Sequence, residues 1–192
     1  STDCPTIKKF SKKYNPKIIT RPKRIQSPNT LTEDVLQHAH EEIKKDVGGI
    51  DNIKYYILLY ANGAFLNSSL IKKAVKKLDN DKKFDSCVGV INADMFTPIR
   101  AKTIDKKKGI KPFIPLNKFK KITSNRDSAG NAYFMDLSLQ ILRPKCFEKM
   151  NGNQKPFLWL GNKILPFEKE FGGDIDANWQ FTILEKWLKK NF

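Results

Sequence analysis

The chain has 192 residues, of which 40% are hydrophobic and 11% aromatic, which excludes a disordered protein and fits one domain with a proper core. The net charge of +16 comes from dispersed lysine doublets, with arginine supplying only five of the 36 basic residues, so we expect no nucleic-acid partner. No apolar stretch approaches the ~20 residues that cross a bilayer, and three distant cysteines favour a reducing cytoplasm, with no membrane partner.

The first predicted elements are a short strand and a helix. Residues 17–20 are mostly apolar and predict a short strand that stops at the following proline. Residues 30–33 have the spacing of a capping box, and apolar residues then recur at helical period over 31–43. The glycine pair at 48–49 predicts the end of that helix.

A strand–helix–strand pattern follows. Residues 55–60 form a continuous apolar run, as expected of a strand that is buried on both faces. Apolar residues recur at helical period over 70–78, after a polar cap at Asn67 or Ser68, and predict a helix. Residues 84–91 predict the next strand. Strands joined through a helix usually pair in parallel. We therefore expect an α/β fold with three layers, in which helices cover both faces of a mostly parallel sheet.

The chain then leaves this alternating pattern. The stretch 94–131 is rich in lysine and proline and has a turn signal at 106–109, which predicts an inserted arm over 97–132. Residues 133–143 mix polar and apolar side chains as a strand does. Since no internal repeat or linker divides the chain, we predict a single domain over 1–192.

The most informative stretch is Gly172-Gly173-Asp174-Ile175-Asp176. In an extended segment positions i and i+2 project the same way, so Asp174 and Asp176 would converge on one point. The two glycines leave room for another backbone or a ligand. Paired carboxylates suit a hydrated divalent cation, which takes one or two carboxylates plus substrate phosphates. The alternative is that Asp176 caps the C-terminal helix and that Asp174 is merely solvated.

An ordered set of short motifs runs along nearly the whole chain. In sequence order they are Ser1-Thr2-Asp3, Arg21-Pro22, Ser27-Pro28-Asn29-Thr30, Asp34-Val35-Leu36-Gln37-His38-Ala39, and Gly173-Asp174-Ile175-Asp176 with Trp179. Together they resemble the acylneuraminate cytidylyltransferases, the CMP-sialic acid synthetase family. The resemblance implies a nucleotide-diphospho-sugar transferase-like fold. It also implies an enzyme that transfers CMP from CTP to a nonulosonic, sialic-acid-like sugar for surface polysaccharide, releasing pyrophosphate.

The resemblance further implies roles for single residues. Asp174 and Asp176 would be the catalytic pair and would hold the Mg²⁺ that bridges the triphosphate and the attacking sugar hydroxyl. The cytidine part of CTP would be bound by a second set: Arg21, Ser27, Asn29 and Thr30. Taken without the resemblance, Arg21 and the proline after it could simply terminate a strand.

Four residues would bind the acid sugar: Tyr60, Asn62, Arg126 and Tyr133. The segment that begins at Tyr60 departs from the family's usual "QPTSPLR" and is closer to the "YATAPFL" of members that activate pseudaminic acid. Arg126 would clamp the sugar carboxylate, because bidentate guanidinium–carboxylate pairing fixes position as well as charge. The alternative for Arg126 is a surface salt bridge.

The resemblance also bears on assembly and activity. In the family the arm packs against a second subunit, which implies a homodimer. The family's first strand and glycine-rich nucleotide loop would precede Ser1 and are not in this sequence, so we expect poor CTP binding and slow or absent turnover. A non-catalytic scaffold and a basic nucleic-acid-binding module remain as alternative functions. The sequence does not name the acid sugar, nor does it decide whether Tyr60, Asn62 and Leu66 reflect a new specificity or decay.

Overall fold

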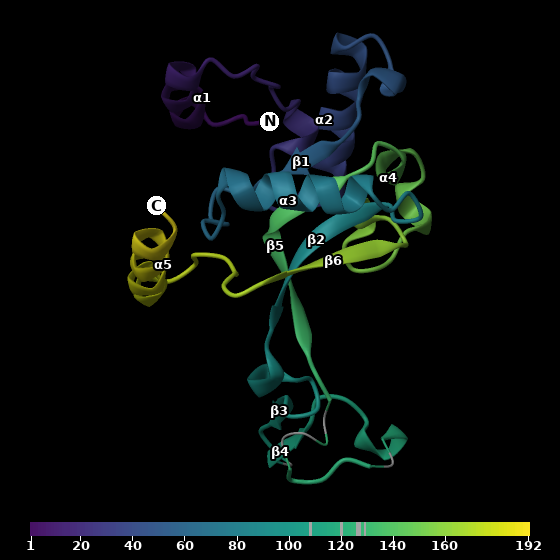
Figure 1. Ribbon diagram of the computed structural model, residues 1–192, viewed down its shortest axis with the longest axis vertical. Helices are drawn as coiled ribbons and strands as arrows, with labels where there is room; N and C mark the ends of the chain where they lie inside the picture. Colours follow the sequence, from purple (N-terminus) through teal and green to yellow (C-terminus); the bar gives the residue numbers. More distant parts are fainter. Residues whose placement is uncertain (108, 120, 126–127, 129) are drawn as a thin grey trace. The chain divides into compact units, whose positions relative to one another are not determined.

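The computed structural model describes residues 1–107, 109–119, 121–125, 128 and 130–192 (Figure 1). Four strands form one mixed sheet in the order β1–β5–β2–β6. Their bounds are β1 Tyr56–Leu58, β2 Ser86–Asn92, β5 Tyr133–Leu142 and β6 Ile164–Lys169. The α-helices are α1 Pro5–Ser11, α2 Thr32–Asp46, α3 Ser68–Asp79, α4 Lys145–Glu148 and α5 Asn178–Asn191. In the parts of the chain that the structure describes, no helix is both long and apolar enough to cross a bilayer.

The chain divides into two compact units, each assembled from three segments. Unit 1 comprises Ser1–Ile57, Leu78–Ser86 and Ile141–Leu165, and it contains α1, α2 and α4. Unit 2 comprises Leu58–Lys77, Cys87–Gln140 and Pro166–Phe192, and it contains most of β2 and β5 together with α5. The domain predicted over 1–192 therefore contains two units of dense local packing.

Unit 1 is built around a buried histidine on α2. The Nδ1 atom of His40 lies 2.8 Å from the hydroxyl of Tyr56, and its ring stacks on Phe147 at 5.3 Å. This hydrogen bond satisfies a polar group that would otherwise be unpaired among apolar side chains. Arg143 joins two segments of the same unit, because its guanidinium donates to the backbone carbonyls of Leu78 and Phe84.

Helix α2 ends as predicted but begins differently. Gly48 has a φ of +77°, and the N–H of Gly49 donates to the carbonyl of Lys44 at 2.9 Å, which closes the helix. The predicted capping box is wrong, because Leu31 occupies the N-cap and no side chain caps the helix. Thr30 belongs to the preceding turn, where its N–H donates to the carbonyl of Ser27.

Two predicted strands also differ from the structure. Residues 17–20 form no regular strand, since the chain there has a single backbone bond to another segment, from the N–H of Thr2 to the carbonyl of Ile19. The apolar run at 55–60 yields only the short β1, which stands at the end of the sheet order. The exposed fraction of Ile57 is 44%, so β1 is not buried on both faces.

The region predicted as an arm contains a β-hairpin of unit 2. Strands β3 (Lys102–Asp105) and β4 (Gly109–Pro112) pair antiparallel, with Ile104 opposite Ile110. Figure 1 shows the hairpin in the stretch between β2 and β5. Both isoleucines are exposed, at 83% and 71%. The turn signal at 106–109 is therefore confirmed.

Candidate functional site

The loop that carries the carboxylate pair begins against a buried aspartate of β5. Gly173 has a φ of +106°, a conformation that side chains other than glycine rarely adopt. A Cβ on Gly172 would lie 2.6 Å from the carboxylate carbon of Asp136 and 2.9 Å from the Cγ2 of Ile91. The N–H of Gly173 donates to Asp136 Oδ1 at 3.1 Å. The glycines thus allow a close approach to a carboxylate of the protein itself.

The other end of the loop is held by Asn62. The N–H of Ile175 donates to the backbone carbonyl of Asn62 at 2.9 Å. The side-chain amide of Asn62 donates to Asp176 Oδ1 at 3.0 Å. The structure therefore brings together two predicted site residues, Asn62 and Asp176, that lie far apart in the sequence.

Asp176 does not cap the C-terminal helix. Helix α5 begins at Asn178 and has Ala177 at its N-cap. The side-chain oxygen of Gln180 accepts hydrogen bonds from the N–H groups of Asp176 and Ala177, at 2.7 and 2.6 Å. Gln180 thus reaches back to the residues before the helix. Asp176 is exposed on the loop, and its carboxylate accepts the side-chain amide of Asn62.

Asp174 is half-buried, and its Oδ1 atom is buried without a hydrogen-bond partner among the residues that the structure describes. Burial, followed by the negative charges of Asp176 and Asp136, raises the pKa of Asp174 above its ordinary value. A buried carboxylate oxygen without a donor is costly, so this atom suits contact with a cation. The prediction that Asp174 is merely solvated is wrong.

Asp174 and Asp176 suit a cation that takes its remaining ligands from the phosphates of a substrate. Among the residues that the structure describes, no group of three or more His, Cys, Asp or Glu could hold a metal ion. A site on Asp174 and Asp176 would therefore supply two carboxylates only. Mg²⁺ is commonly bound by one or two carboxylates plus substrate phosphates, and it retains water.

The other predicted sugar contacts lie in unit 2 or outside the described residues. The carbonyl of Tyr60 accepts the N–H of Gly63 in the turn that carries Asn62. Tyr133 is exposed at the start of β5. Arg126 lies outside the described residues.

The predicted cytidine contacts lie in unit 1. Asn29 and Thr30 share a turn with Ser27, whose side chain accepts the N–H of Asn29 at 3.2 Å. The guanidinium of Arg21 donates to the carbonyl of Ser1 at 3.2 Å and lies 3.6 Å from the carboxylate of Asp3. Arg21 thus joins the first two motifs of the chain and does not end a regular strand.

Three functional candidates of unit 2 were missed from the sequence: Asp136, Ser138 and Lys169. Asp136 and Ser138 lie two residues apart on β5, so they share one face of the strand. Two polar residues at that spacing, in a strand otherwise largely apolar, were the available signal. Lys169 gave none, because lysine is common throughout this sequence.

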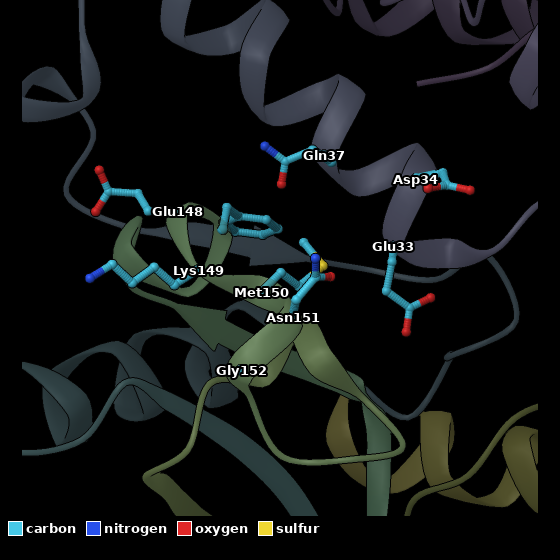
Figure 2. A pocket seen from close by; sticks show the side chains of 9 residues that line it. Glu33, Asp34, Gln37, Glu148, Lys149, Met150, Asn151 and Gly152 are labelled. Carbon is cyan, nitrogen blue, oxygen red and sulfur yellow. The ribbon is translucent and has the colours of Figure 1, made fainter.

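A separate pocket of about 380 Å³ lies in unit 1 (Figure 2). It is lined by Glu33, Asp34 and Gln37 of α2 and by Phe147, Glu148, Lys149, Met150, Asn151 and Gly152. Three carboxylates against one lysine would repel the phosphates of a nucleotide. None of the predicted site residues that the structure describes lines this pocket, so the candidate site is not placed there.

Gly172→Ala tests the close approach of the loop to Asp136. Because the added Cβ would collide with the carboxylate, we expect the free energy of unfolding to fall by about 1–3 kcal/mol, measured by urea denaturation. Gly152→Ala is the matched control, since a Cβ there would meet nothing within 4 Å. An unchanged unfolding midpoint for Gly172→Ala would contradict the described packing.

Comparisons with known proteins show the fold. No model of a known family matches the sequence, and no curated protein is significantly similar to it. A solved CMP:2-keto-3-deoxy-manno-octonic acid synthetase, complexed with CTP, is similar over 99% of this chain and 79% of its own, with a TM-score of 0.59 and 12% identity. A Bacillus anthracis protein, assigned as a glucose-1-phosphate thymidylyltransferase and complexed with a sucrose, is similar over 94% of this chain and 70% of its own, with a TM-score of 0.52 and 14% identity. The chain therefore shares a mixed α/β fold with these two proteins, which agrees with the predicted nucleotide-diphospho-sugar transferase-like fold. The three-layer arrangement and the dimerisation arm stay predictions.

Proposed function

We propose that this chain is a Mg²⁺-dependent nucleotidyltransferase that transfers CMP from CTP to an acid sugar of the nonulosonic type. The observation that carries the proposal is the buried Oδ1 of Asp174, which has no partner in the described part of the chain. It lies on a loop that is fixed at both ends and also carries the exposed Asp176. The fold supports nucleotidyl transfer, because it is shared with a CTP-bound sugar synthetase. The choice of an acid sugar rests on the ordered motifs of the sequence.

The reaction requires the chain to position two anionic reactants. The sugar hydroxyl oxygen attacks the α-phosphorus of CTP, the new O–P bond forms, and the bond to the β-phosphate bridge breaks to release pyrophosphate. The hydroxyl proton passes to water. Mg²⁺ held by Asp174 and Asp176 would neutralise charge on the phosphates. Asn62 fixes the orientation of Asp176 through its side-chain amide.

The remaining binding roles are part of the same proposal. Tyr60, Asn62, Arg126 and Tyr133 would contact the acid sugar, and the turn at 27–30 together with Arg21 would contact cytidine. The net charge of +16 favours anionic substrates of this kind.

Asp174→Asn and Asp176→Asn test the proposed site by ligand-induced stabilisation. We expect excess CTP with Mg²⁺ to raise the Tm of the wild-type chain more than UTP or ATP does, and each variant to lose that rise. Excess nucleotide keeps weak binding measurable, because the stabilisation grows with the ratio of ligand concentration to Kd.

Asp81→Asn is the control, because it removes an equivalent charge from a loop carboxylate that pairs with Lys83. It should keep the CTP response. Any pyrophosphate released from CTP with acid sugars should fall in the two site variants and not in the control. A Tm insensitive to CTP, or a response retained by Asp174→Asn, would contradict the proposal.

We also propose that the arm is the contact of a homodimer. Ile104 and Ile110 face each other across the hairpin and are exposed, as is Phe113, whose N–H anchors it to the carbonyl of Ala101. A contiguous group of exposed apolar side chains marks a candidate contact with another protein.

Ile104→Lys combined with Ile110→Lys tests the arm. We expect this variant to be monomeric by light scattering at concentrations where the wild type is dimeric, because two charges cannot be buried at the contact. Tyr14→Lys, at an exposed position of unit 1, should leave the dimer intact. A monomeric wild type, or a dimer that persists in the double variant, would contradict the proposal.

A further inference from the structure

A buried ion pair lies beneath the carboxylate loop in unit 2. The exposed fraction of Asp136 is 1%, and the side chain of Lys169 is 2% exposed and pairs with Asp136 Oδ2. The same Oδ2 accepts the hydroxyl of Ser138 at 2.8 Å, and the ammonium of Lys169 also donates to that hydroxyl oxygen at 2.9 Å. Removing two charges from water costs several kcal/mol per ion, which good geometry and additional hydrogen bonds must offset.

The second oxygen of Asp136 is directed at the loop. Oδ1 accepts two backbone N–H groups, from Ser138 at 3.2 Å and from Gly173 at 3.1 Å. One carboxylate therefore joins its own strand to the residue immediately before Asp174. Hydrogen bonds to a charged acceptor are roughly twice as strong as neutral ones, so this contact fixes the loop firmly.

Two glycines, one on β2 and one on the loop, leave room for the ion pair to lie close to the backbone. A Cβ on Gly89 of β2 would lie 2.9 Å from the carbonyl oxygen of Asp136 and 3.2 Å from the Cδ of Lys169. A Cβ on Gly172 would collide with the carboxylate of Asp136. Neither β2 nor the loop could carry a side chain at these positions with the pair in place.

We propose that Asp136, oriented by Lys169, is the positioning residue for the metal-binding carboxylate of Asp174. This inference rests on the metal role of Asp174 in the proposed function. Asp136 fixes the N–H of residue 173 and Asn62 fixes the N–H of residue 175, so the backbone on both sides of Asp174 is held. No residue that the structure describes donates a hydrogen bond to the Oδ1 of Asp174.

Lys169 also sets the charge of the site. It pairs with Asp136 and so offsets part of a third negative charge close to Asp174 and Asp176. Asp174 and Asp176 have no ion pair among the described residues, and two carboxylates match the charge of a divalent cation. Residues that orient a metal ligand without touching the metal typically change the metal affinity 10–100-fold when they are replaced.

The test is a titration of the full chain with Mn²⁺, in which the electron paramagnetic resonance signal of free Mn²⁺ measures how much metal stays unbound. The variant is Asp136→Asn combined with Lys169→Met, which replaces the ion pair by neutral groups of similar size and leaves no charge unpaired. We expect its Kd for Mn²⁺ to rise 10–100-fold while urea denaturation still shows a cooperative transition. Asp174→Asn should abolish binding at this site.

Asp85→Asn is the matched control. Asp85 accepts the N–H groups of Asn162 and Lys163 at 2.9 and 2.8 Å, pairs with Lys145 at 2.6 Å, and packs against Gly161. It therefore has the same kinds of contact as Asp136, but in unit 1. We expect Asp85→Asn to lower the free energy of unfolding and to leave Mn²⁺ affinity at the wild-type value.

Three outcomes would overturn the inference: wild-type Mn²⁺ affinity in the double variant, an equal loss of affinity in Asp85→Asn, and no Mn²⁺ binding by the wild type. If the double variant does not fold, Ser138→Ala replaces it, since it removes one donor to Asp136 without changing any charge. Its Kd should rise by a smaller factor, and an unchanged Kd would refute the proposal. A chain that binds Mn²⁺ through Asp174 but is not stabilised by CTP would refute the proposed function alone.

Discussion

Two backbone hydrogen bonds determine the geometry of the candidate site. The N–H of Gly173 donates to Asp136, 37 residues earlier in the chain, and the N–H of Ile175 donates to the carbonyl of Asn62. A neutral hydrogen bond contributes about 0.5–1.5 kcal/mol net, and one to a charged acceptor about 1.5–3 kcal/mol. These contributions are large enough to hold in one conformation the short loop that carries Asp174 and Asp176.

The same arrangement is unfavourable for stability taken alone. Asp136, Asp174 and Asp176 lie in one unit, where the buried Lys169 pairs with Asp136. Among the described residues, no donor reaches the buried Oδ1 of Asp174. Burial of such groups is destabilising unless a partner compensates them. Folded proteins retain local strain of this kind mainly at functional sites, where a ligand supplies the missing contact. A cation bound to Asp174, as in the proposed function, would supply the missing contact.

Local sequence patterns predicted the elements but not the contacts between them. Helical periodicity gave α2 and α3, whereas the joint role that the spacing of Asp174 and Asp176 indicated stays a prediction. The capping box failed because Thr30 was already engaged in a turn with Ser27. Asp136 was missed because its partners, Lys169 and Gly173, come from a distant part of the chain, and no local period records such contacts.

The central claim is that Asp174 and Asp176 hold a divalent cation together with a nucleotide. The most direct measurement is a crystal structure of the chain with Mn²⁺ and CTP, using the anomalous scattering of the metal to locate it. The claim predicts an anomalous peak in contact with Asp174 Oδ1, with the CTP phosphates completing the coordination. A metal bound elsewhere, or a CTP complex in which Asp174 Oδ1 still has no ligand, would contradict it.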